Sequence, residues 1–102
     1  MVYSQALLNS MVRQLQQVFG TDSLQAHTEE ELLRHLSPMV LHLLRHNLSH
    51  LLHILYRVDV EEHQVKRAML SDTEEAVADS IARLIVAREL QKAQIRYRYS
   101  QN

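Results

Sequence analysis

The stretch SPMVLHLLRHNLSHLLHILYR, residues 37–57, joins a serine–proline pair to a long run of leucines and histidines. Proline fits the first turn of an α-helix and disrupts a helix interior. We therefore expect Ser37 to cap a helix that begins at Pro38 and continues to about Arg57. Its apolar face covers close to half of the circumference, so this helix is predicted to form the centre of the core. That face contains Leu43, Leu44, Leu48, Leu51, Ile54, Leu55 and Val58.

The histidines of the same stretch fall on the other side of this predicted helix. Helical residues advance by about 100° each, so four of the histidines lie within an arc of roughly 80°. They are His42, His46, His50 and His53. Because they lie across from the leucines, we expect water or a second copy of the chain to cover this histidine stripe.

Helical periodicity continues towards the N-terminus. Apolar residues at three- and four-residue spacing predict a helix over about 3–19, which Gly20 ends at a position that favours glycine. Thr28 and Glu31 have the spacing of a capping box. They predict a short second helix over about 29–36.

The C-terminal half carries two further helix starts. Asp59 stands in the brief connector VDV (58–60), three residues before Glu62, and is predicted to cap a helix over about 60–70. Ser71 or Asp72 is predicted to cap a last helix over about 73–98. Acidic residues at the beginning of this helix and basic residues at its end both complement the helix macrodipole.

Length and composition bound the fold. A chain of 102 residues has the length of one domain, and one glycine and one proline leave few turn residues for β-hairpins. We predict a single all-α domain over residues 1–102, a small bundle of four to five helices. The last helix would be roughly 39 Å long, so we expect it to overhang the core and to lie against a second copy of the chain.

A metal site is the alternative function for the histidine stripe. Histidines four residues apart on a helix can chelate one ion, so zinc or another transition metal would be the cofactor. The candidate ligands are His42, His46, His50 and His53. No acidic residue lies between Glu31 and Asp59, so further ligands would have to come from another helix or chain.

A pH-sensitive surface is a further hypothesis for the same histidines. Arg45 and Arg57 share the stretch with them, and protonation near pH 6 would add like charges. If an interface covers the histidine stripe, that interface should loosen at low pH.

Charge and residue types exclude several other classes of site. The formal net charge is −1, which argues against a strong electrostatic field that gathers nucleic acid or anionic lipid. The absence of cysteine removes disulfides and thiolate ligands, and a single glycine removes a glycine-rich phosphate loop. The acidic pairs Glu61–Glu62 and Glu74–Glu75 lie at predicted helix starts, where acids stabilise the dipole. We therefore expect no enzyme and no catalytic residue.

The C-terminal segment RELQKAQIRYRYSQN interleaves basic and aromatic side chains from residue 88 onward. Basic side chains can contact the phosphates of a nucleic-acid strand, and aromatic side chains can stack on its bases. Weak nucleic-acid binding is therefore a third hypothesis. For the cations we favour complement of the helix dipole and a solvated tail, and the tyrosines can equally pack on a partner helix. The interface candidates are Arg88, Lys92, Ile95, Tyr97 and Tyr99.

The segments LYRVDVEEHQV (55–65) and IARLIVARELQKAQIRYRY (81–99) resemble a family of short, uncharacterised all-helical bacterial proteins. The shared features are an LYR–hydrophobic–DV turn into an acidic helix start and a long final helix with an R-x-L-Q-K-like end. The resemblance covers about half of the chain. It implies a helical fold and brings no activity, cofactor or site residue.

Together these patterns favour a small, non-enzymatic helical interaction or scaffolding protein that self-associates as a homodimer, with another protein as the alternative partner. The most apolar stretch, 36–55, is long enough to span a bilayer, but Arg45, Asn47 and the histidines make such a span unfavourable. The N-terminal residues lack a basic region followed by an apolar run. We therefore expect a soluble cytoplasmic protein that binds no membrane and no cofactor.

Overall fold

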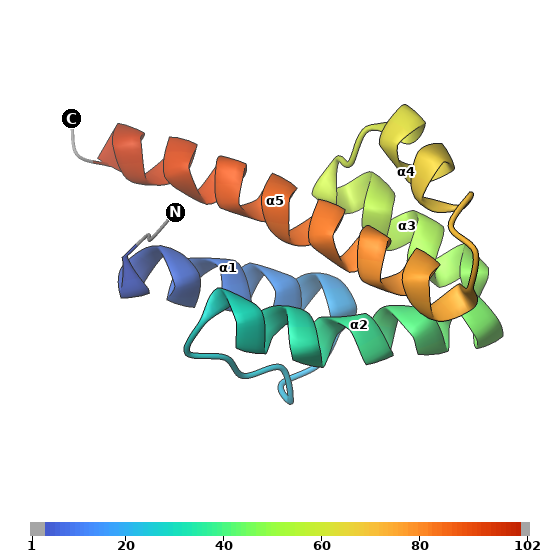
Figure 1. Ribbon diagram of the computed structural model, residues 1–102. Coiled ribbons are helices and arrows are strands. Elements are labelled where there is room, and N and C mark those ends of the chain that lie inside the picture. The colour runs from blue at the N-terminus through green and yellow to red at the C-terminus, as the bar shows by residue number, and fades with distance from the viewer. Residues whose placement is uncertain (1–3, 101–102) are drawn as a thin grey trace.

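The computed structural model describes residues 4–100, and these residues form five α-helices and no β-strand (Figure 1). The prediction of an all-α bundle is confirmed. The helices are α1 (Gln5–Phe19), α2 (Glu29–His46), α3 (Leu48–Val58), α4 (Glu62–Ala68) and α5 (Glu74–Ser100).

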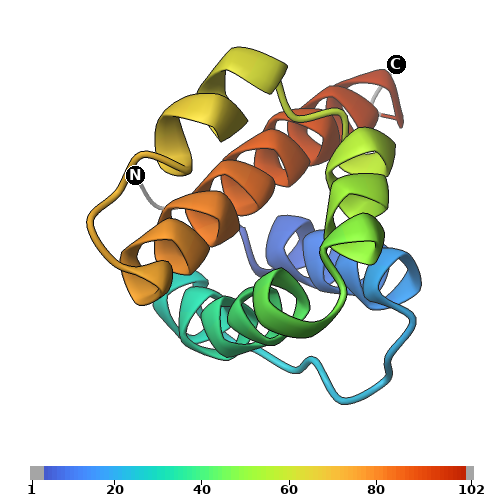
Figure 2. The same ribbon diagram turned by 90° about the vertical axis from the view of Figure 1, so that its right-hand side faces the viewer.

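The last helix, α5, is the centre of the bundle. With 27 residues, it is long enough to contact each of the other four helices. Its buried side chains run from Val77 to Ala93 and spread over about half of its circumference. Figure 2 shows α1 to α4 arranged around it. The core is therefore centred on α5, and the prediction that a helix over 38–57 forms its centre is wrong.

Pro38 lies inside α2 and does not begin a helix. The prediction of separate helices over 29–36 and 38–57 is therefore wrong at this point. Fully buried side chains recur every four residues on both sides of the proline and pack in the core against α5. Their burial outweighs the backbone hydrogen bond that proline cannot make. These side chains are Leu32, Leu36 and Val40.

The helix break falls instead at Asn47, which ends α2 and begins α3. Its N–H donates to the carbonyl of Leu43 at 2.8 Å, and its side-chain Oδ1 accepts from the N–H of His50 at 3.2 Å. Asparagine is one of the preferred N-cap residues. A single residue therefore terminates one helix and caps the next.

Two of the predicted helix ends are confirmed. Gly20 follows α1 in the left-handed conformation, with φ 68°. The Oγ1 atom of Thr28 accepts from the N–H of Glu31 at 3.0 Å and so caps α2. Both ends depend on contacts within a few residues of sequence.

Two other predicted caps are wrong. Asp59 adopts the left-handed conformation, with φ 70°, and ends α3 instead of starting the next helix. Thr73, rather than Ser71 or Asp72, caps α5, because its Oγ1 accepts from the N–H of Ala76 at 3.0 Å.

The C-terminal part of α5 projects beyond the core. From Gln94 onward, none of its described side chains is buried. The longest dimension of the molecule is 43 Å, close to the length of about 40 Å that α5 has by itself. The described residues contain no helix that is both long and apolar enough to cross a membrane.

Replacement of the proline tests how strongly packing holds α2 together. We expect Pro38→Ala to raise the free energy of unfolding by about 1–2 kcal/mol. The carbonyl of Arg34 regains a backbone donor, and the greater freedom of the unfolded chain offsets part of this gain. Urea denaturation followed by circular dichroism measures the change. Loss of stability would contradict our account of α2.

Candidate functional site

The histidine stripe is divided between two helices, because the chain breaks at Asn47. His42 and His46 lie in the last turns of α2, with ring centroids 4.7 Å apart and ring planes tilted by 43°. His50 and His53 lie on α3. His50 is half-buried, and the other three are exposed. The expected stripe along one continuous helix is therefore wrong, although most of its members do face solvent.

A shallow hollow of about 330 Å³ lies between α1, α2 and α3 and has two histidines in its lining. His42 reaches it from α2 and His50 from α3. The other lining residues are apolar: Phe19, Pro38, Met39 and Leu43. Within residues 4–100, no three His, Asp or Glu side chains come together as they would to hold a metal ion.

This geometry leaves His42 and His46 as the pair best placed to chelate an ion. We expect zinc to bind untagged protein weakly through this pair, since two imidazoles make only half of a tetrahedral site. Isothermal titration calorimetry should show that His46→Ala removes this binding. The exposed His53→Ala is the control and should leave it unchanged. Tight one-to-one binding of zinc would contradict the expectation and favour the metal function.

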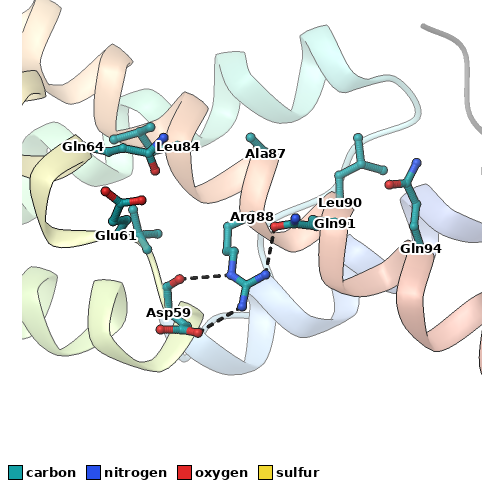
Figure 3. Close-up of a pocket in the computed structure, with 10 residues that line it drawn as sticks. Asp59, Glu61, Gln64, Leu84, Ala87, Arg88, Leu90, Gln91 and Gln94 are labelled. Carbon is teal, nitrogen blue, oxygen red and sulfur yellow. Dashed lines mark hydrogen bonds and ion pairs between the residues drawn. The ribbon is translucent and has the colours of Figure 1, made fainter.

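Two of the interface candidates, Arg88 and Lys92, hold the C-terminal end of α3 against α5. Arg88 Nε donates to the backbone carbonyl of Asp59 at 3.0 Å, and its Nη2 lies 3.0 Å from the Asp59 carboxylate (Figure 3). Lys92 Nζ donates to the carbonyl of Val58 at 3.0 Å. Cations at a helix C-terminus complement the macrodipole. Both side chains therefore have a structural role within the chain.

Glu89 is a buried carboxylate beside this contact, with only 1% of its surface exposed. Its Oε2 lies 3.2 Å from Lys92 Nζ, and its Oε1 lies 3.8 Å from Arg96 Nη2 without a hydrogen-bond partner. Arg96 in turn donates to Ser10 Oγ of α1 at 3.3 Å. This charged group thus connects α5 with both α1 and α3.

Removal of the buried carboxylate should destabilise the fold. We expect Glu89→Ala to lower the free energy of unfolding by about 2–3 kcal/mol, because it opens a cavity and removes the acid that faces Lys92. Glu62→Ala is the matched control, since Glu62 forms a largely exposed pair with Lys66. That substitution should cost less than about 0.5 kcal/mol. Equal effects in chemical denaturation would contradict the structural role of Glu89.

The acidic start of α5 is also paired within the chain. Arg45 at the end of α2 lies 3.3 Å from Glu74 and 3.4 Å from Glu75. One turn later, Asp79 accepts from Ser37 at 3.2 Å and from Arg83 at 2.9 Å. The hydrogen bond and charge of Asp79 raise the pKa of the Arg83 guanidinium above its ordinary value. These pairs are largely exposed, so each contributes little to stability.

Large exposed apolar side chains gather mainly at two places. On α3 they recur every fourth residue and form what we call the α3 strip: Leu48, Leu52 and Tyr56, exposed by 45%, 49% and 83%. The other place is the C-terminal end of α5, residues 95–99, which we call the α5 overhang: Ile95 and Tyr99 share one side of the helix there, and Tyr97 lies on the opposite side. Leu70, between α4 and α5, stands apart from both groups. The apolar pattern predicts Leu48 in the core, but the structure leaves it nearly half exposed.

A groove of about 670 Å³ runs along α5 beside the start of α4 (Figure 3). Arg88 crosses it, held by Asp59 and by a 2.9 Å hydrogen bond to Gln91. Three glutamines and several small or apolar residues make up most of the remaining lining. The α5 groove is lined by Asp59, Val60, Glu61, Gln64, Leu84, Ala87, Arg88, Leu90, Gln91 and Gln94.

The sequence pattern does not predict this groove, because the groove depends on where α4 begins along α5. The four- and three-residue spacing of Ala87, Gln91 and Gln94 on the last helix is a signal that could have indicated a seam for another helix.

Comparison of the chain with protein-family models, with curated proteins and with solved structures gives no match. The resemblance noted at 55–65 and 81–99 therefore stays a prediction. The function has to be argued from the chain's own residues.

Proposed function

We propose that this protein is a small, non-enzymatic helical interaction protein that self-associates. The observation that carries the proposal is the grouping of exposed apolar side chains on the α3 strip and the α5 overhang. Single exposed apolar residues are normal on protein surfaces, whereas groups of them mark sites of association.

The use of the charged residues supports a non-enzymatic role. Catalytic sites place buried or perturbed ionisable groups in a cleft, where substrate can reach them. Here the buried Glu89 faces Lys92 and Arg96, and the Arg88 that crosses the α5 groove is held by Asp59. These groups hold helices together.

Association with a second copy is favoured by charge and by shape. A formal net charge of −1 produces little repulsion between two copies. The α5 overhang projects beyond the core as a helix end with aromatic and aliphatic side chains. A symmetric homodimer is the commonest way to cover such a surface.

Sedimentation velocity over micromolar to submillimolar concentrations tests this function. We expect the weight-average mass to rise from monomer to dimer as the concentration increases. Ile95→Gln or Leu52→Gln should weaken the association, because each removes apolar surface from one of the two groups. Leu70→Gln is the control, since Leu70 is exposed outside both groups. A monomer mass at every concentration would overturn self-association.

A further inference from the structure

One face of α5 carries the pattern of a helix-pairing seam. Its residues recur at alternating three- and four-residue spacing, as in the seam of a coiled coil. Ala87, Gln91 and Arg98 on this face are exposed. The helix that packs beside it, α4, begins only at Glu62. The seam consists of Leu84, Ala87, Gln91, Gln94 and Arg98.

The seam is complementary to itself when two copies run antiparallel. A two-fold axis between Gln91 and Gln94 places each Gln91 opposite the partner's Gln94. A glutamine amide both donates and accepts, so the two pairs can exchange hydrogen bonds. Polar pairs at the seam positions of two helices fix their register. The same axis places Arg98 opposite the partner's Ala87, whose small side chain leaves room for it.

The positions of two unpaired charged residues also favour the antiparallel arrangement. Glu61 and Ala87 both line the α5 groove, and the Arg88 that also lines it is already paired with Asp59. Glu61 and Arg98 are both exposed, and neither forms an ion pair within residues 4–100. The groove therefore holds an uncompensated acid, and the overhang carries an uncompensated base.

We infer that two copies of this chain pair antiparallel through α5, with the α5 overhang of each copy lying in the α5 groove of the other. Arg98 then pairs with the partner's Glu61, and by symmetry this contact occurs twice. Figure 3 shows the lining of this groove, from Glu61 and Gln64 at one end to Gln94 at the other. The inference rests on the proposed self-association, because it names the surface that performs it.

Charge reversal in the full chain tests the pairing. We expect Arg98→Glu and Glu61→Arg each to raise the dimer dissociation constant about tenfold, since each replaces two attractions by two repulsions. The double variant should recover to within about threefold of the original constant, because the attraction is restored with reversed sign. Arg13→Glu is the matched control, an exposed arginine on α1 that should leave the constant unchanged. Sedimentation velocity measures the constants, and circular dichroism confirms that helix content is kept.

Cysteine crosslinking gives a second test, which is specific because the chain contains no cysteine. An oxidised mixture of Gln91→Cys and Gln94→Cys chains should form more covalent dimer than either variant does alone. If the three preparations crosslink equally, the antiparallel register is overturned.

The outcomes separate the inference from the proposed function. If the chain dimerises and Arg98→Glu behaves like Arg13→Glu, the α5 pairing is overturned while self-association stands. If the unmodified chain is monomeric at every concentration, both are overturned. Weakening by each single reversal with recovery in the double variant supports both.

Discussion

Burial of α5 against four other helices is the constraint on which the rest of the structure depends. A helix surrounded over about half of its circumference has to present small and branched apolar side chains in several directions, as it does from Val77 to Ala93. The other helices then need only one apolar face each, directed towards α5. The packing of α2 on this central helix keeps it continuous through Pro38.

Apolar burial stabilises the packed helices but does little to fix their relative positions, because it is not directional. The charged contacts of α5 are directional and fix these positions. Arg88 and Lys92 hold the end of α3 by its carbonyl groups, while Glu89 lies between Lys92 and Arg96. A sliding movement of α3 along α5 would leave a buried carboxylate and helix-end carbonyls without partners. Such groups are costly to leave unpaired. The contacts therefore fix one position of α3, and with it the place of the α3 strip.

The sequence predicts well those features that depend on near neighbours. Gly20 and Thr28 mark helix ends through contacts within a few residues, and both predictions are confirmed. The helix start predicted at Pro38 is wrong, because the free-energy cost of proline inside a helix is smaller than the gain from packing a continuous α2 on α5. The helix break at Asn47 is not predicted, because the leucines on both sides of it continue the helical pattern. Its side chain is nevertheless one that commonly caps a helix. The α5 groove depends on where the start of α4 lies in space, which periodicity alone does not encode.

The contacts of α5 also change how its basic end acts on molecules in solution. Counted along the sequence, four cations gather there, which is the pattern of a positively charged patch. In the folded chain, Arg88 faces Asp59, while Lys92 and Arg96 share one acid, Glu89. Opposite charges a few ångströms apart largely cancel beyond a Debye length of about 10 Å. The electrostatic potential at long range from this end is therefore that of about two positive charges rather than four, one from Arg98 and one from the surplus cation beside Glu89. Shape and hydrogen bonding at short range then contribute more to the selection of a partner than the sequence suggests.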